Sequence, residues 1–298
     1  MQNLSDNMKG ALLMMCSMAA FTFNDTCIKA LGPEMPLFQL LVIRGAITSV
    51  LIYVLARSMG AIRLRLPAKD WGLIALRTTS EIGAAFFFIT ALMNMPIANV
   101  TAVLQVLPLT VTLGGALLFR EAVGWRRMVA ILIGFAGMLL IVRPGPDGFS
   151  EHALFALAAV ACVTARDLST RRLSPTVPSM TVTLAASVGV MLFALVATTQ
   201  ETWVPVGPRE LALLGGASLF IFGGYLFSVM VMRVGDVSFV APFRYTGLLW
   251  ALLLGLVVFG DWPDPLTLLG AAIVVATGVF TLIREGQLRR RRQSAKSV

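Results

Sequence analysis

Long runs of apolar residues, separated by short polar and turn-forming segments, dominate the chain. The clearest run extends from Ala84 to Phe119 and is broken only by the link from Asn94 to Asn99. Two apolar spans joined by so short a link form a helical hairpin, and a lipid bilayer is the natural surrounding for one this apolar. Arg77 and Glu81 stand just before the run. Because a charge inside a membrane span is costly, such residues usually mark a path for a polar solute.

The same pattern recurs along the whole chain and predicts ten membrane-spanning helices, so the fold class is an all-α membrane protein. Each predicted span has about 20 mostly apolar residues, enough to cross the hydrocarbon core. Proline and glycine punctuate several of the boundaries. The predicted spans are 9–31, 37–57, 71–93, 99–119, 125–143, 151–173, 179–199, 209–233, 238–259 and 265–284.

Composition and charge agree with this prediction. Hydrophobic residues make up 57% of the 298 positions and charged residues only 13%, against about a quarter in soluble domains. Of the 24 lysines and arginines, 17 fall on the side of the two termini, three on the other side and four within spans. This asymmetry places both termini in the cytoplasm and explains the net charge of +9 without nucleic acid. The three cysteines lie in apolar runs without CxxC spacing, which indicates packing residues.

The chain also repeats internally. A shift of 142 residues lays Asp25 on Asp167 and Lys29 on Arg171, and from the third span onward a shift of 140 residues aligns the halves. Because each half has five spans, the second half enters the membrane from the opposite side, so the halves are inverted repeats. Inverted repeats are typical of secondary transporters, whose substrate site lies near the bilayer midplane. The predicted parts are a first repeat 1–146, a second repeat 147–288 and a basic cytoplasmic tail 289–298, in which Arg289 to Arg292 are expected to act as a stop-transfer signal or as a lipid-headgroup anchor.

Two charge pairs within the spans are candidates for gating. Asp25 with Lys29 and Asp167 with Arg171 are spaced i, i+4, so each pair shares one helix face. The inverted repeat puts the first pair near the outer mouth and the second near the inner mouth. Our hypothesis is that they act as alternating ionic latches. The alternative is that they cap or orient helix ends in every state.

Two prolines are further candidates for gating. Pro108 and Pro242 remove backbone hydrogen bonds from the fourth and ninth spans, which the repeat makes equivalent. Helices loosened in this way bend more easily, which suits a gate. A static kink is the alternative.

Four other intramembrane charges have no ionic counterpart in the repeat and are candidates for substrate binding. A charge that the fold requires would more often appear in both halves, so Arg44, Arg77, Glu81 and Arg244 favour function. The guanidinium of Arg44 suits a substrate carboxylate, with pairing to Asp25 as the alternative. Glu81 suits a substrate ammonium or a proton, with an intrahelical pair to Arg77 as the alternative.

Aromatic residues complete the predicted substrate site. Arg244 follows Pro242 by two residues, so it is expected where a loosened helix lines a cavity. Tyr245 and Trp250 are candidate walls for a flat apolar substrate, with packing or interfacial anchoring as the alternative.

Several residues carry a likeness to a known family. They are Phe23 and Lys29 in the first span, Arg44 in the second, the stretch Ala98 to Gly137 with Pro108, and the glycines Gly270 and Gly278. In these the chain resembles the drug/metabolite transporter superfamily, in particular its ten-helix EamA branch. Within the branch it is similar to YddG-type exporters of aromatic amino acids, although Phe21 stands near the place of a frequent tryptophan. The resemblance implies a bacterial inner-membrane location. It also implies a central cavity lined by spans 1, 3, 4, 6, 8 and 9, with spans 5 and 10 at the periphery.

The predicted function is a secondary transporter that exports small zwitterionic or amphipathic metabolites, above all aromatic amino acids, by alternating access. Uptake or exchange of a nucleoside-like or S-adenosylmethionine-like solute is the alternative. The sequence has no GxxxxGK[ST] motif, so a gradient must drive transport, and no cofactor is expected.

Two other classes of protein are disfavoured. An enzyme is disfavoured because the one histidine, His152, lies at a loop edge and no HExxH, GxSxG or carboxylate-rich metal motif is present. A channel is disfavoured because no filter-like loop or ring of like charges is present. The expected partners are a small-molecule substrate and the lipid bilayer, with no nucleic acid and no metal, and the chain is expected to work as a monomer.

Overall fold

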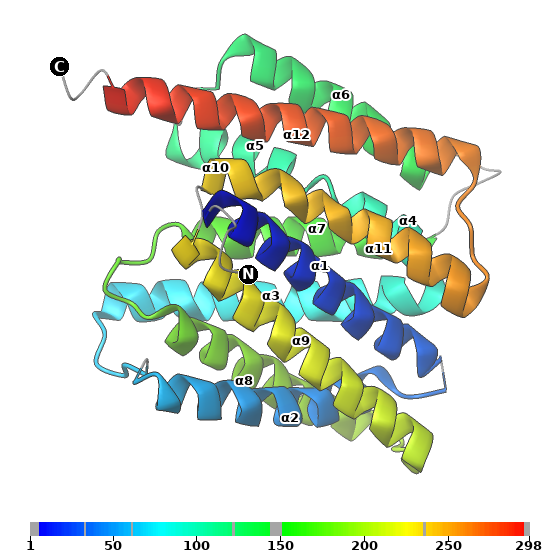
Figure 1. Cartoon of the computed structure of the whole chain (residues 1–298). Helices are drawn as coiled ribbons and strands as arrows, with labels where there is room; N and C mark the ends of the chain where they lie inside the picture. The colour runs from blue at the N-terminus through cyan, green and yellow to red at the C-terminus, as the bar shows by residue number, and fades with distance from the viewer. Residues whose placement is uncertain are drawn as a thin grey trace. The chain divides into compact units, whose positions relative to one another are not determined.

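The computed structural model describes residues 6–32, 34–60, 62–120, 123–143, 151–234 and 237–294. Within these residues all regular structure is helical and no strand occurs, and ten segments are long and apolar enough to cross a membrane (Figure 1). This confirms the predicted all-α fold with ten spans. The predicted boundary at residues 146 and 147 lies outside the described residues, as do residues 295–298 and the side chains of Arg289 to Arg292.

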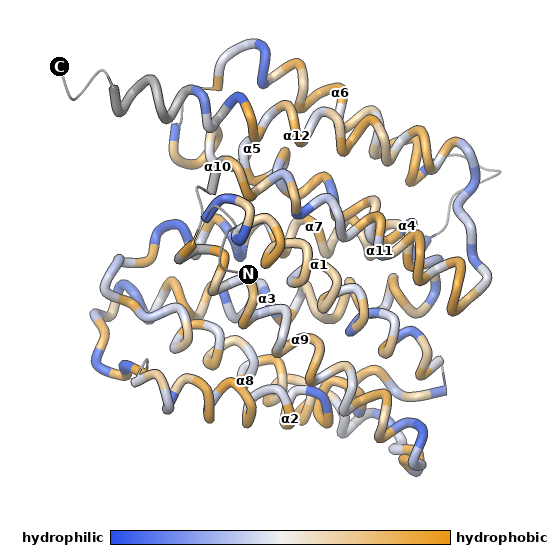
Figure 2. Tube along the Cα trace, in the orientation of Figure 1, coloured by the Kyte–Doolittle hydropathy of each residue, from blue (hydrophilic) through white to orange (hydrophobic). Residues whose placement is uncertain are grey.

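Most of the observed helices begin and end close to the predicted spans, but α12 continues ten residues past the predicted end at 284, into the predicted tail. The α-helices are α1 (Asp6–Ala30), α2 (Leu37–Ser58), α3 (Ala68–Asn94), α4 (Ile97–Leu104), α5 (Leu107–Phe119), α6 (Trp125–Val142), α7 (Glu151–Thr170), α8 (Ser179–Ala197), α9 (Pro208–Val234), α10 (Val237–Val240), α11 (Thr246–Leu254) and α12 (Pro265–Ser294). Two 3₁₀ segments, η1 (Thr198–Gln200) and η2 (Ala241–Tyr245), and a π-helical turn, η3 (Gly255–Phe259), complete the set. Hydrophobic residues dominate the helices, and hydrophilic residues gather toward helix ends and turns (Figure 2).

The chain forms two compact units, each described here by itself. Unit 1 comprises Met1–Thr22, Pro96–Ser150 and Gly223–Val298, and unit 2 comprises Phe23–Met95 and Glu151–Phe222. In unit 1, α6 packs on α12 and α4 packs on α11. In unit 2, α3 packs on α7 and α2 packs on α8. The repeat relates α2 to α8, α6 to α12, and the fourth span to the ninth, so in these three pairs a helix packs on its own counterpart.

The contact between α2 and α8 has the geometry of an inverted repeat. Ser49 hydrogen-bonds to Ser187 at 2.8 Å, and a Cβ on Gly45 would lie 3.0 Å from the Cβ of Met191. The 142-residue shift lays Gly45 on Ser187 and Ser49 on Met191. Each of the two contacts is therefore the image of the other, as antiparallel packing about a two-fold axis requires.

Small residues bring α6 and α12 close together in unit 1. A Cβ on Gly137 would lie 2.8 Å from Cγ2 of Ile273 and 3.0 Å from the carbonyl oxygen of Gly270. Glycine on both helices permits this backbone approach, which is a common way for helices to associate in membranes. At one end of the pair, Arg143 forms an ion pair with Asp264, whose carboxylate also accepts from the backbone N–H of Thr267 and so caps α12.

The fourth and ninth spans are interrupted, as their prolines predict. Pro108 lies in the first turn of α5, where its missing N–H is tolerated, and the span breaks just before it at Gln105 and Val106. In the ninth span, Pro242 lies in the tighter 3₁₀ segment η2. The 140-residue shift lays Gln105 on Tyr245, so the two interruptions fall at equivalent levels. Discontinuous spans in matching places of two repeats are typical of transporter sites.

Candidate functional site

Four charged side chains on α3 and α7 form one connected cluster in unit 2. Arg166 on α7 donates from Nη1 to both carboxylate oxygens of Glu81 on α3, at 3.4 Å each, and from Nε to Asp167 at 2.9 Å. Arg77 lies one turn before Glu81, with its Nη2 3.8 Å from the Glu81 carboxylate. Its Nε donates to the hydroxyl of Thr170 at 3.1 Å. The predicted residues Arg77, Glu81 and Asp167 thus come together, and Arg166 joins them.

Helix geometry explains why these charges meet. The i, i+4 spacing puts Arg77 and Glu81 on one face of α3. Two residues after Glu81, α3 carries Gly83, where a Cβ would lie 2.9 Å from the Sγ of Cys162 on α7. Because no side chain intervenes at Gly83, the two antiparallel helices approach closely enough for the charges of one to reach the other.

The cluster is balanced in charge but loosely bonded. Two arginines face two carboxylates, and the side chains of Arg77 and Glu81 are only 13% and 17% exposed. Good charge-assisted bonds measure about 2.7–2.9 Å, so both contacts to Glu81 are long. Among the residues that the structure describes, the buried Nη1 atom of Arg77 has no hydrogen-bond partner. An unsatisfied buried donor costs free energy. The cluster therefore retains capacity for another charged group.

A second polar network links α1 and α2 in unit 2. The side-chain amide of Asn24 donates to Asp25 at 2.8 Å and accepts from Nη1 of Arg44 at 3.3 Å. Asn24 thus connects the predicted partners Asp25 and Arg44. The Nζ of Lys29 donates to the carbonyl oxygens of Leu92 (3.2 Å) and Met95 (2.7 Å), where it caps the end of α3. This contact is what the helix-orienting alternative for Lys29 predicts.

The two networks correspond in the repeat. The 142-residue shift that lays Asp25 on Asp167 also lays Asn24 on Arg166, and in each pair the first side chain donates to the second. The two pairs differ in charge: Asn24 is neutral beside Asp25, whereas Arg166 is a cation beside Asp167. Arg171, the counterpart of the capping residue Lys29, is exposed beyond the end of α7.

The latch hypothesis predicts opposite effects of the two aspartates. We expect Asp167→Asn to shift the balance between inward and outward accessibility, because it removes the carboxylate that Arg166 holds. Asp25→Asn is the matched variant and is expected to shift the balance the other way. Labelling of single cysteines placed at either mouth measures both shifts. Unchanged labelling in both variants would leave only the helix-orienting role.

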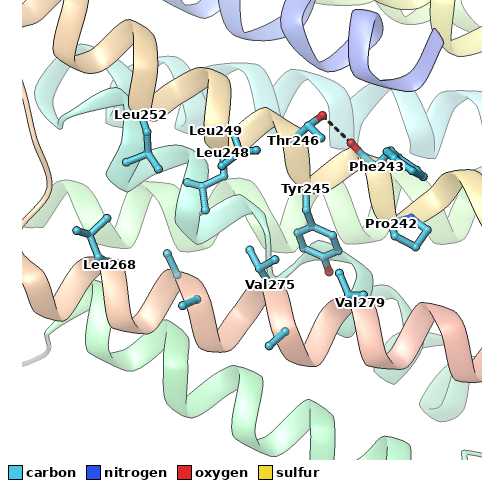
Figure 3. A pocket seen from close by; sticks show the side chains of 13 residues that line it. Pro242, Phe243, Tyr245, Thr246, Leu248, Leu249, Leu252, Leu268, Val275 and Val279 are labelled. Carbon is cyan, nitrogen blue, oxygen red and sulfur yellow. Dashed lines mark hydrogen bonds between the residues drawn. The ribbon is translucent and has the colours of Figure 1, made fainter. Parts of the chain in front are cut away.

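The remaining predicted residues lie in unit 1 on the interrupted ninth span. Tyr245 is 6% exposed and, with Pro242, lines a cavity of ≈ 590 Å³ between this span and α12 (Figure 3). Arg244 precedes Tyr245 on η2 and is exposed. Consecutive residues of a 3₁₀ helix point about 120° apart, so the two side chains occupy different faces. Trp250 lies on α11 and is half-buried, outside the cavity lining.

Sequence reasoning missed four polar residues of these sites. Asn24, Arg166 and Thr170 complete the networks of unit 2. Gln105 lies at the break in the fourth span, with its Nε2 4.0 Å from where a Cβ on Gly247 would be. The repeat was a signal for three of them, since Asn24 aligns with Arg166 and Gln105 aligns with Tyr245. Thr170 had no such signal, because its counterpart is Ile28.

Ten apolar spans, half-buried charge networks and two interrupted helices define a multi-pass membrane protein of the transporter class. The chain belongs to the EamA-like transporter family, whose model matches residues 8–143 and again residues 151–283. The two successive matches agree with two repeats of one five-span unit. The family consists of transporters, which supports the prediction that the chain is not an enzyme.

Relatives and a solved structure agree with this assignment. The chain is 28% identical to the riboflavin transporter of Vibrio cholerae, over 96% of this chain and 97% of the relative. It is 22% identical to the S-adenosylmethionine uptake transporter of Rickettsia prowazekii, with 95% of each covered, and 27% identical to the pseudopaline exporter of Pseudomonas aeruginosa, with 91% and 95% covered. A solved chain reported as "Crystal structure of protein" has the same fold, with a TM-score of 0.64, 21% identity, and 92% and 96% covered.

Proposed function

We propose that the chain is a secondary transporter that exports small zwitterionic or amphipathic metabolites by alternating access. It works as a monomer in the bacterial inner membrane, with both termini in the cytoplasm. Residues 1–146 and 147–288 form the two repeats that exchange conformations. Aromatic amino acids are the first substrates to test, because the chain resembles YddG-type exporters.

One observation carries this proposal: a charge-balanced but unsaturated cluster within two membrane spans. Arg77 has a free donor atom for a substrate carboxylate, and the long contacts of Glu81 leave its carboxylate able to hold a substrate ammonium. A zwitterion supplies one group of each sign, so it can bind without leaving a net charge in the membrane. A singly charged solute lacks this advantage.

A second candidate function is uptake or exchange of a nucleoside-like or S-adenosylmethionine-like solute. It is favoured by the near full-length matches to an S-adenosylmethionine uptake transporter and a riboflavin transporter. S-adenosylmethionine also carries an amino-acid zwitterion, so the same cluster suits it. The two candidates differ in the ring system of the solute and in the direction of transport.

Purified protein in liposomes tests both candidates. Labelled phenylalanine, tyrosine, tryptophan, S-adenosylmethionine, riboflavin and adenosine are offered one at a time, inside or outside the vesicles. We expect saturable flux of a zwitterionic solute that is accelerated by the same solute on the opposite side, as in a carrier whose empty form returns slowly. Empty liposomes are the control. Flux that rises linearly with concentration and shows no such acceleration would contradict a transporter.

A further inference from the structure

The cavity beside Tyr245 has the size and position of a ligand site. Its volume of ≈ 590 Å³ lies within the range of about 300–1,000 Å³ of small-molecule sites. On α12 its lining runs from Leu268 to Val279, which corresponds to about 16 Å along the helix. The span of α12 runs from Pro265 to Arg284, so the cavity lies around the middle of the membrane. Transporter substrates bind at this level.

The chemistry of the lining is almost wholly hydrocarbon. Leucine, valine, alanine, proline and phenylalanine side chains form nearly all of it. The hydroxyl of Thr246, which also lines the cavity, donates to the carbonyl oxygen of Phe243 at 2.7 Å. Such walls exclude charged groups and favour a flat apolar ring or chain. The cavity therefore suits an uncharged ring or chain.

One polar group in this lining stands out. Tyr245 reaches from η2 toward α12, with its hydroxyl near Val275 and Val279 (Figure 3). Within the part of the chain that the structure describes, this buried hydroxyl has no hydrogen-bond partner. Gly278 makes room for it, because a Cβ at that position would overlap the hydroxyl. A buried phenol normally finds a partner, since an unmade hydrogen bond costs free energy.

We propose that this cavity binds the ring of an amphipathic substrate, and that the Tyr245 hydroxyl donates a hydrogen bond to an acceptor atom of a heteroaromatic ring. The proposal rests on the proposed transport function and names its substrate class more closely. Apolar walls hold the flat faces of the ring, and the single hydroxyl distinguishes a ring that carries an acceptor from one that does not. The solute is therefore a heteroaromatic metabolite rather than a simple hydrocarbon amphiphile.

A matched pair of ligands tests this recognition directly. Toluene and 3-methylpyridine are uncharged, as the apolar walls require, and have the same shape, but one ring CH of the first is an acceptor nitrogen in the second. Equilibrium binding to purified protein in nanodiscs, after subtraction of partition into empty nanodiscs, is expected to favour 3-methylpyridine by up to about tenfold, the effect of one neutral hydrogen bond. In Tyr245→Phe the preference is expected to vanish, while toluene binding stays the same.

Two further variants separate the cavity from the rest of the chain. Ala276 lines the cavity and is exposed, so Ala276→Trp fills the space without disturbing a buried contact. It is expected to weaken both ligands at least tenfold. Ala136→Trp on α6 is the matched control, because Ala136 is also an exposed helical alanine. It is expected to leave both affinities unchanged.

Other outcomes would overturn the inference. A ligand preference that persists in Tyr245→Phe would show that the hydroxyl does not hydrogen-bond to the acceptor atom of the ring. A phospholipid with a photoactivatable acyl chain that labels the cavity, and that neither ligand displaces, would identify a lipid site instead. Flux in liposomes is measured separately. Saturable transport of a heteroaromatic solute with no effect of Tyr245→Phe refutes only the ring site, whereas absence of transport of every solute refutes the proposed function.

Discussion

Replacement of Arg77 by glutamine is expected to raise the KM for a carboxylate substrate by about 10- to 100-fold. A hydrogen bond to a charged group contributes about 1.5–3 kcal/mol, and 1.4 kcal/mol corresponds to a factor of ten. Within the described residues, the Nη1 atom of Arg77 has no hydrogen-bond partner, so a substrate carboxylate can accept from it. The fold should survive the change, because Arg166 keeps its contacts to Glu81 and Asp167. Transport into liposomes measures the KM.

A substrate analogue makes the test of Arg77 specific. With the carboxylate replaced by a neutral amide, the wild-type protein should already bind weakly, and Arg77→Gln should weaken binding little further. Arg63→Gln is the control for a lost cation, because Arg63 lies outside the spans and its side chain donates only to a backbone carbonyl in the described residues. Equal losses of acid and amide in Arg77→Gln would assign the arginine a structural role alone.

Neutralisation of Glu81 is expected to have the second large effect, on both transport and stability. Glu81→Gln leaves Arg77 and Arg166 with only Asp167 to balance them. Loss of one partner of a buried ion pair costs about 3–5 kcal/mol, and the partial exposure of this cluster lowers the expected cost to about 2 kcal/mol. Unfolding in a graded detergent series measures the stability, and flux at several pH values measures the transport.

A double variant separates the two effects of Glu81. Glu81→Gln combined with Arg77→Gln restores the charge balance, since Arg166 and Asp167 remain paired at 2.9 Å. We expect stability to recover while transport stays low, because the substrate then lacks both of its charged partners. If Glu81→Gln alone keeps the wild-type rate and pH dependence, the residue takes no part in substrate or proton binding.

Much of the fold could be predicted because it depends on patterns that a sequence displays. Ten apolar runs set the spans, and Pro108 and Pro242 marked the interrupted ones. The pairing of Arg77 with Glu81 followed from helical spacing alone. Contacts between helices were harder to predict from the sequence. Whether Arg166 also reaches Glu81, beyond its neighbour Asp167, depends on how α7 is rotated against α3, and the close packing of Gly83 on Cys162 fixes part of that geometry.

The contacts of Lys29 also show that sequence alone does not predict polar contacts between helices. Its i, i+4 spacing to Asp25 indicated an ion pair within one helix. In the structure its ammonium also satisfies carbonyl groups at the end of α3, 63 and 66 residues away in sequence. Free carbonyls at a helix end attract any nearby cation, and sequence spacing does not show which helix end will be near. Polar networks between helices thus need the tertiary structure.

The self-related contacts of α2 and α8 have a consequence for the transport cycle. In alternating access by inverted repeats, each half adopts the conformation that the other has left. The Ser49–Ser187 contact and the Gly45–Met191 contact are images of each other. When the two halves exchange conformations, each contact therefore takes the place of the other, and the α2–α8 interface as a whole, here called the seam, is unchanged. The seam can therefore remain closed in the inward-facing and outward-facing states alike. Under the proposed alternating-access mechanism, the α2–α8 interface is the stationary part of the protein. Movement is then expected at other interfaces, including the interrupted fourth and ninth spans that carry Pro108 and Pro242.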